Sequence, residues 1–464
     1  MIEQVTPRNA QGRAASVAAL RDRIASMGGI GTSMRHGVAG SAMASPRRPA
    51  SVRVDPGQLG FEAETTPAGV AWVRRVSVDL GPFLHRAGAT GPVPLAALGR
   101  LGCAAVADQA SADHPWSSRP GASAMVLDIE SLGLRGSGVL AFLVGVGVPR
   151  GDRLDIDQLL VADPGAEAAM LSALHARVAS STVLVSYNGR SFDVPMLVAR
   201  SVINRLPATV FEERRHSDLL GPVRRLFRER LQGCTLRQCE LGLLAFERVD
   251  DVPGYEAPGR YRAWLRGGVA DVLEGVVRHN ELDLCSTMVL AARVADHVDG
   301  RLITPVHPAD RYHLGMHLER SGSASDQLRD EPAVHYRAAY EAEVLPWSRR
   351  AGHRLAHTLR RAAVPEAIDE AITILQHLWN TDPRDLRAAR SLAILLERCG
   401  RIDEALSVAV TAQRSALTMP RWGTRRLAGE PPHGWSEDWR RRSARLGQRV
   451  ERTRHVEASR RIAS

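Results

Sequence analysis

The stretch Ala124-Met-Val-Leu-Asp128-Ile-Glu130 decides the fold, because a short apolar run leads directly into two acids. A run of this length bounded by polar residues is typical of a buried strand. An acid at the end of such a strand is costly to bury unless another group neutralises its charge. Side chains alternate along a strand, so Asp128 and Glu130 lie on one side and their carboxylates converge. Two solvated acids at a strand end would explain this pattern equally well.

The segments that follow predict an α/β domain. Further strands are expected at 139–148, 154–160 and 182–187. Asp163 and Pro164 begin a predicted helix, because Asp caps free amides and Pro fits the first helical turn. We expect helices over most of 192–298. Three adjacent strands of hairpin type, then a helix and another strand, are typical of α/β folds.

Two further groups of polar residues carry potential chemistry. The fourth strand runs into the turn Asn188-Gly-Arg190, and Asp193 follows where a helix begins. Asp193 alone is better explained as a helix cap. His279 and Asp283 are four residues apart in a helical stretch and therefore share one helix face. Such a pair alone is more often a surface interaction than a site.

Taken together, the three groups resemble the DEDD exonucleases of the ribonuclease H-like superfamily. That family carries Asp-x-Glu on its first strand, Asn-x-x-x-Phe-Asp after the fourth strand, and a His and an Asp on a terminal helix. The chain also resembles the YprB-like branch, in which a ribonuclease H-like domain is joined to tetratricopeptide repeats. The stretches that carry this second resemblance are 127–134, 141–145, 187–193, 216–220, 234–236 with Glu240, 251–254, and 279–280 with Asp283. The resemblance covers roughly residues 60–300, and the repeats at 334–415 extend it.

The resemblance implies a ribonuclease H-like mixed sheet flanked by helices, followed by an α-helical tetratricopeptide-like repeat region. It also implies a metal-dependent 3′–5′ exonuclease or related phosphodiesterase that uses two Mg²⁺ or Mn²⁺ ions about 3.5–4 Å apart. The implied metal ligands are Asp128, Glu130, Asp193 and Asp283. Their carboxylate oxygens are hard ligands, which suit these ions better than zinc. One ion would generate hydroxide, and the other would stabilise the leaving 3′-oxygen.

Other residues complete this hypothesis. His279 is the best candidate to take the proton of the attacking water, because imidazole exchanges protons near neutral pH. Asp218 is a candidate fifth acid near the metals, with a structural role as the alternative. The residues predicted to bind nucleic acid are Tyr187, Asn188 and Arg190. His279 stands four residues before Asp283, which is the spacing of the family's Tyr-type members, whereas its His-type members place His five residues before the Asp.

Composition and periodicity divide the chain into segments. We predict a disordered Arg/Ala-rich N-terminus at 1–60, a lead-in subdomain at 61–120, the ribonuclease H-like domain at 121–300, a linker at 301–331, tetratricopeptide-like helical repeats at 332–415 and an Arg-rich C-terminal tail at 416–464. The repeats are indicated by Ala367-Ile-Asp-Glu-Ala371, which recurs as Arg401-Ile-Asp-Glu-Ala405, 34 residues later. This is the period of a tetratricopeptide repeat. Two units are fewer than the usual three, so we expect them to pack against other helices.

Composition also excludes several classes of protein. With 44% hydrophobic and 24% charged residues, the chain is neither wholly disordered nor fibrous. No apolar run reaches the roughly 20 residues that span a bilayer, so no membrane association is expected. The five scattered cysteines form no CxxC pair, which favours a reducing, cytoplasmic location. All 61 basic residues are arginine; a compositional bias of the genome would explain this, and Arg-rich ends are also able to contact phosphate.

The leading hypothesis is therefore an enzyme that cleaves single-stranded nucleic acid and recruits a protein partner through its helical repeats. The alternative is a catalytically weak or inactive nuclease-like scaffold that binds nucleic acid or protein partners through those repeats. The presence of all four acids favours the first hypothesis, although a retained metal site does not prove turnover. The sequence does not distinguish RNA from DNA as the substrate.

Overall fold

The computed structural model describes residues 54–92, 123–133, 139–267, 269–321, 331–362, 364–418 and 434–463. The predicted disorder of the N-terminus therefore falls almost wholly outside the described residues. Much of the predicted lead-in subdomain, at 93–120, and residues 322–330 of the predicted linker also lie outside them.

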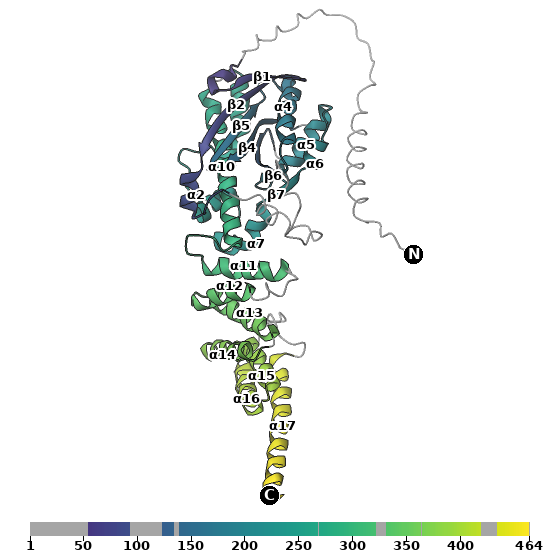
Figure 1. Ribbon diagram of the computed structural model, residues 1–464, viewed down its shortest axis with the longest axis vertical. Coiled ribbons are helices and arrows are strands. Elements are labelled where there is room, and N and C mark those ends of the chain that lie inside the picture. The colour runs from purple at the N-terminus through teal and green to yellow at the C-terminus, as the bar shows by residue number, and fades with distance from the viewer. Residues whose placement is uncertain are drawn as a thin grey trace, which may run out of the picture. The chain divides into compact units, whose positions relative to one another are not determined.

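In the described residues, seven strands form one mixed sheet in the order β1-β2-β5-β4-β3-β6-β7 (Figure 1). They are β1 (Glu62–Thr66), β2 (Gly69–Asp79), β3 (Ala124–Ser131), β4 (Ala141–Arg150), β5 (Arg153–Leu160), β6 (Val183–Ser186) and β7 (Arg215–Asp218). The pairs from β1 to β3 are antiparallel, whereas β6 pairs with β3 and β7 in parallel. The fold is thus the predicted mixed α/β sheet.

Two parts of this sheet differ from the sequence-based expectation. Strands β1 and β2, predicted to belong to a lead-in subdomain, extend the central sheet because β2 pairs with β5 along its length. Strand β7 lies in a segment predicted to be mostly helical, and it forms because the backbone at 215–218 pairs with β6. The sheet therefore begins well before residue 121 and gains an edge strand after the fourth predicted one.

The helices that flank the sheet follow the α/β pattern. They are α2 (Gly81–Ala87), α4 (Glu167–Ala179), α5 (Asp193–Ile203), α6 (Thr209–Glu212), α7 (Leu220–Leu231), α8 (Leu236–Cys239), α9 (Ala257–Leu265) and α10 (Asp271–Val298). Single turns add the 3₁₀ helices η1 (Pro56–Leu59), η2 (Pro164–Ala166) and η4 (Gly254–Glu256) and the π-helical turn η3 (Glu240–Leu244). None of the described helices has the length and apolar character needed to cross a membrane.

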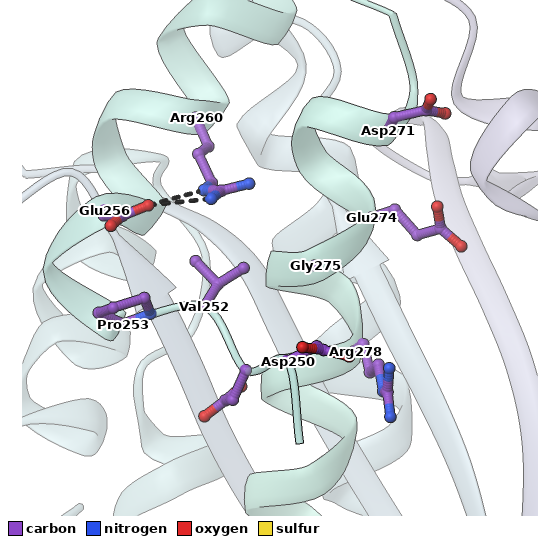
Figure 2. A pocket seen from close by; sticks show the side chains of 10 residues that line it. Asp250, Val252, Pro253, Glu256, Arg260, Asp271, Glu274, Gly275 and Arg278 are labelled. Atoms are coloured by element: carbon purple, nitrogen blue, oxygen red, sulfur yellow. Dashed lines mark hydrogen bonds and ion pairs between the residues drawn. The ribbon is translucent and has the colours of Figure 1, made fainter. Parts of the chain in front are cut away.

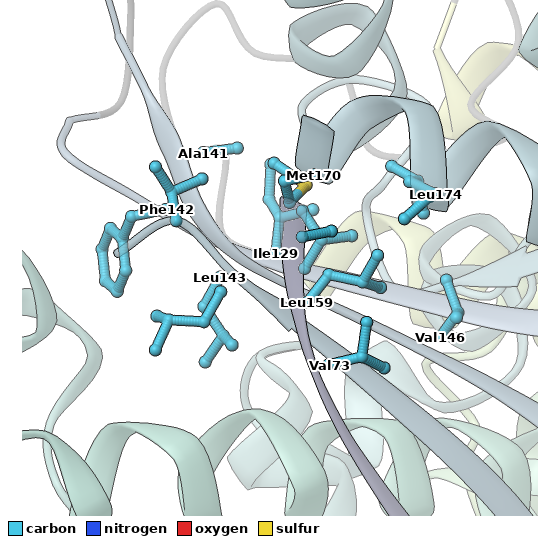
Figure 3. Packing of buried hydrophobic residues seen from close by; sticks show 14 of the residues in the cluster. Val73, Ile129, Ala141, Phe142, Leu143, Val146, Leu159, Met170 and Leu174 are labelled. Carbon is cyan, nitrogen blue, oxygen red and sulfur yellow. The ribbon is translucent and has the colours of Figure 1, made fainter. Parts of the chain in front are cut away.

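Strand β3 separates two hydrophobic clusters. Its residues alternate between them: Leu127 and Ile129 belong to one cluster and Val126 to the other, as the period of two requires. Figure 3 shows Ile129 in one cluster with Met170 and Leu174, which come from α4. Because both sides of β3 are packed, the strand and the acids at its end are held rigidly.

Helix α10 approaches the sheet closely at a glycine in β4. A Cβ atom on Gly145 would lie 2.6 Å from Leu284 Cδ1 and even closer to Asn280 Oδ1. No side chain larger than hydrogen fits there, so glycine permits this approach. The contact brings the middle of α10 alongside β3 and β4.

Seven helices follow the sheet domain in the described residues. They are α11 (Pro308–Ser321), α12 (Glu331–Glu341), α13 (Trp347–Ala362), α14 (Pro365–Thr381), α15 (Leu386–Arg398), α16 (Ile402–Thr418) and α17 (Trp435–Ala463). Each of these helices packs on the next, which gives a region of paired helices. The two copies of the 34-residue pattern fall on α14 and α16, where Ala371 and Ala405 are buried. Part of the predicted linker is helix α11, and much of the predicted tail is helix α17.

We predict that Gly145→Ala destabilises the protein by about 1–3 kcal/mol, because the added methyl overlaps the buried side chain of Asn280, which hydrogen bonds hold in place. The matched control is Gly259→Ala in α9, where the added Cβ meets no heavy atom within 4 Å apart from its chain neighbours and the backbone of its own helix. This control should gain up to about 1 kcal/mol from helix propensity. Urea unfolding of both variants measures the difference, and equal midpoints would contradict the close packing of α10 on β4.

Candidate functional site

The four predicted acids come from three elements that meet beside β3. Asp128 and Glu130 lie on β3, Asp193 is the first residue of α5, and Asp283 lies on α10. The charges of Asp283 and Asp193 raise the pKa values of both acids on β3. The charge of Asp283 also raises the pKa of Asp193. The structure therefore brings these four side chains within electrostatic reach of one another.

Burial is the largest cause of the raised pKa values at this site. It acts with Asp283 and Asp193 to raise the pKa of Glu130 to about 8. Burial also raises the pKa of Asp193 to about 7, against the lowering effect of its own backbone amide. The pKa of Asp128 lies well above its usual range for the same reasons, burial first. These carboxyl groups lack sufficient positive charge nearby, and a bound cation would supply it.

A chain of buried hydrogen bonds holds Asp128 in place. Asn280 Nδ2 donates to Asp128 Oδ2 at 2.8 Å, and Gln158 Nε2 donates to Asn280 Oδ1 at 2.9 Å. Arg74 Nη1 then donates to Gln158 Oε1 at 2.6 Å and to Glu281 Oε2 at 2.8 Å. Gln158 and Asn280 are fully buried. Asn280 belongs to the stretch 279–280 that carried the family resemblance, but the sequence alone gave it no role.

Asp283 is bound by an arginine that the sequence analysis missed. The buried guanidinium of Arg248 donates through Nη2 to Asp283 Oδ1 and through Nε to both carboxylate oxygens of Glu240, at 3.0 and 2.9 Å. Its Nη1 atom donates to Asp251 Oδ2 at 3.3 Å. Within the described ranges, no group of three or more His, Cys, Asp or Glu residues is arranged to hold a metal ion. The four acids are thus coupled by charge, while one of them faces a guanidinium.

His279 makes its short contact with a residue other than its predicted partner. Its Nδ1 atom lies 2.7 Å from Asp251 Oδ1, whereas its Nε2 atom lies 3.6 Å from Asp283 Oδ2. The shared helix face of His279 and Asp283 is thus real, but of these two acids only Asp251 lies within hydrogen-bond distance of the imidazole. Asp251 belongs to the stretch 251–254 that carried the family resemblance, which was the available signal for it.

Asp218 ties down the loop that follows β6. Its carboxylate accepts hydrogen bonds from the backbone amides of Asn188 at 2.9 Å, Arg190 at 3.0 Å and Leu220 at 3.0 Å. Its charge also contributes to the raised pKa of Asp193. The geometry therefore gives Asp218 a structural role beside the acids.

The predicted nucleic-acid-binding residues divide into two kinds. The hydroxyl of Tyr187 donates to the carbonyl of Cys234 at 2.7 Å and so faces the protein interior. Asn188 and Arg190 are exposed, and Arg190 Nη2 donates to the carbonyl of His216 at 2.6 Å. Only the last two present polar groups to solvent beside the acids.

A pocket of about 520 Å³ has Asp251 among its lining residues (Figure 2). Val252, Glu256 and Arg260 line it from one side, and the first turns of α10 line it from the other. Figure 2 shows Glu256 and Arg260 paired at its edge. The lining contains five acids and two arginines, which disfavours the phosphates of a nucleic acid there.

We predict that the metal-free protein loses stability as the pH rises from about 5 to about 8. The folded-state pKa values of Glu130 and Asp193 are above those of an unfolded chain. The folded protein therefore holds protons that the unfolded chain has released, and this advantage disappears as the pH passes the folded-state values. Urea unfolding in EDTA across this range measures the slope.

Glu130→Gln should flatten that slope, because the amide does not titrate. The control is Glu62→Gln, whose side chain on edge strand β1 is 82% exposed, and it should keep the parental slope. Stability that rises between pH 5 and 8, or an unchanged slope in Glu130→Gln, would contradict the buried and mutually repelling acids.

Comparisons with known proteins agree with this architecture. Residues 125–295 match a family model described as the RNase_H superfamily. The chain is 32% identical over 188 residues to the uncharacterized protein YprB of Bacillus subtilis (strain 168), over 40% of this chain and 45% of that protein. The match thus spans less than half the length of that relative.

Two solved structures show weaker likenesses. A family B DNA polymerase from the hyperthermophilic archaeon Pyrobaculum calidifontis shares 15% identity, with a TM-score of 0.33 over 47% of this chain and 29% of that chain. A product-bound exonuclease I shares 13% identity, with a TM-score of 0.23 over 61% of this chain and 100% of that chain. Both TM-scores are too low to support an argument about function. Residues 125–295, which hold strands β4 to β7 and nearly all of β3, are thus similar to the RNase_H superfamily, and part of the chain is similar to YprB.

Proposed function

We propose that the domain is a metal-dependent nuclease that cleaves phosphodiester bonds of single-stranded nucleic acid from the 3′ end. The observation that carries this proposal is the gathering of acids from β3, α5 and α10, with Glu130 and Asp193 buried and with the charge of Asp283 acting on the other three. Evolution rarely keeps uncompensated buried acids without a function for them, and perturbed pKa values are common at active sites. RNase H-like nucleases typically use divalent metal ions, which would supply the missing positive charge.

The acids fit such ions in their chemistry. Asp128, Glu130 and Asp193 offer carboxylate oxygens, the ligands that Mg²⁺ and Mn²⁺ prefer, and Asp283 would add a fourth carboxylate. We propose that these four residues hold two ions. When bound, the ions would lower the pKa of a water molecule and stabilise the charge of the leaving 3′-oxygen.

His279 would act as the general base. An O–H bond of the attacking water breaks, and Nε2 accepts the proton. The remaining electron pair forms the new O–P bond as the P–O3′ bond breaks, and the leaving oxygen takes up a proton from solvent. The Nε2 atom suits this role because it is the ring nitrogen on the side of Asp283, whereas Asp251 holds the other nitrogen.

Substrate would approach over the loop after β6. Asn188 and Arg190 are exposed beside Asp193, and an arginine side chain can contact phosphate from that position. The chain's net charge of +10 favours a polyanionic ligand. We propose that the paired helices, with their 34-residue pattern, recruit a protein partner in the manner of tetratricopeptide repeats.

One observation favours a second candidate function, a nuclease-like scaffold without significant turnover. The Arg248 guanidinium occupies an oxygen of Asp283 that a metal ion would need. No metal-holding group is found among the residues that the structure describes. If the ion pair persists in the presence of Mg²⁺, the domain would bind nucleic acid without cutting it.

Incubation of the purified protein with 3′- and 5′-labelled single-stranded RNA and DNA separates the two candidates. Parallel reactions contain Mg²⁺, Mn²⁺ or EDTA. A nuclease shortens one polymer from the 3′ end with either metal and is inactive in EDTA. A scaffold leaves every substrate intact but still shifts its mobility in a binding gel.

We predict that Asp128→Asn abolishes metal-dependent cleavage and leaves the fold intact, because it removes the charge of a proposed ligand and little volume. Its melting temperature should match or exceed that of the parent, since the buried charge is gone. The control is Asp155→Asn, whose half-exposed carboxylate on β5 contacts Ser77 and Arg150. The control should cut at the parental rate. Equal rates for Asp128→Asn and the parent would show that the activity belongs to another site or to a contaminant.

A further inference from the structure

We propose that Asp251, itself held by Arg248, is a positioning residue that fixes the tautomer of His279. The proton lies on Nδ1, and Nε2 is left free to accept another. The catalytic consequence rests on the proposed nuclease function, whereas the tautomer itself is a property of the metal-free protein and can be tested without activity.

Arg248 holds this arrangement in a fixed position. Its side chain is 3% exposed and that of Glu240 is 1% exposed, so both groups are withdrawn from water. Contacts from Nε to both oxygens of Glu240 fix the plane of the guanidinium. Its Nη1 and Nη2 atoms then reach Asp251 and Asp283. One rigid cation thus sets the positions of both carboxylates beside His279.

The contacts of Asp251 assign the proton on the imidazole. Asp251 Oδ2 accepts from Arg248 Nη1, and Asp251 Oδ1 lies 2.7 Å from His279 Nδ1. An ionised carboxylate only accepts hydrogen bonds, so Nδ1 must be the donor. Arg248 Nη1 also lies 3.3 Å from Nδ1, but an arginine cannot donate to a nitrogen that already carries a proton.

The other ring nitrogen is left without a hydrogen bond to any described residue. His279 Nε2 lies 3.6 Å from Asp283 Oδ2, which is too far for a hydrogen bond. The side chain is 17% exposed, so a water molecule can reach it. A neutral imidazole with its lone pair on Nε2 is the form that a general base needs.

The arrangement predicts a tautomer switch. If Asp251 is removed, the nearest polar group to His279 Nδ1 is the donor Arg248 Nη1. Nδ1 would then accept that hydrogen bond, and the proton would move to Nε2. Asp251→Asn keeps a carbonyl oxygen that can still accept from Nδ1, so the conservative variant should retain the parental tautomer.

Nitrogen-15 spectra of the full-length, metal-free protein test this prediction. The protein is labelled at histidine, and spectra are recorded at about pH 9, where free imidazole is neutral. The signals of His279 are assigned from their loss in His279→Gln. We expect the Nδ1–H pattern in the parent and in Asp251→Asn, and the Nε2–H pattern in Asp251→Ala. Circular dichroism melting checks that each variant is folded.

The matched control is Arg237→Gln. Arg237 is an exposed arginine whose Nη1 lies 3.9 Å from Asp251 Oδ2. It therefore lies near the same acid as Arg248 but, unlike Arg248, is not buried. Arg237→Gln should keep the parental tautomer of His279. An Nε2–H pattern in the parent, or an Nδ1–H pattern in folded Asp251→Ala, would overturn the proposal.

Kinetics add a separate measurement if the protein cuts nucleic acid. Asp251→Ala should lower kcat by roughly 10²–10⁴-fold with little change in KM, because the base is in the wrong tautomer. Asp251→Asn should recover much of this loss. A complete absence of nuclease activity in the parent would reject the proposed function and leave the tautomer result standing. Normal turnover in Asp251→Ala with a switched tautomer would reject the positioning role.

Discussion

The site depends on the close approach of helix α10 to the sheet, which the missing side chain of Gly145 permits. The helix carries His279, Asn280 and Asp283 on adjacent turns, so its distance from β3 sets the distance of all three from the acids there. Burial on both flanks makes this spacing rigid: the first turns of α10 pack in one hydrophobic cluster and its later turns in the other. Apolar packing therefore sets the positions of these polar side chains.

The charges at this position are balanced unevenly. Arg248 neutralises Asp283 and Glu240 at close range, whereas no cation of the described residues contacts Asp128 directly. Burying an ion pair costs desolvation free energy, and the surplus acids add repulsion. A protein that only needed stability would do better with apolar residues there. The surplus of buried negative charge is the physical reason to regard the region as a candidate functional site.

Local patterns in the sequence predicted the central strands of the sheet, whereas the four acids were singled out only together, through the family resemblance, because each one alone lies in an ambiguous local pattern. Asp128 ends an apolar run, and Asp193 begins a helix after a polar turn. Arg248 was missed because it lies in an irregular segment between η3 and η4, where no periodicity applies. Asp251, in the same segment, was marked only by the resemblance of the stretch 251–254. Strand β7 was missed because its charged sequence becomes a strand only through pairing with β6, which no local propensity encodes.

The hydrogen bonds that link Arg74, Gln158, Asn280 and Asp128 limit how this protein can evolve. These residues come from four different elements, and the two in the middle are sealed from water. Replacement of any one by a residue that cannot make its hydrogen bond leaves a buried polar partner unsatisfied, at a cost of about 1–3 kcal/mol. Each single substitution that loses one of these hydrogen bonds therefore destabilises the protein. Related chains should keep all four residues or have exchanged all four.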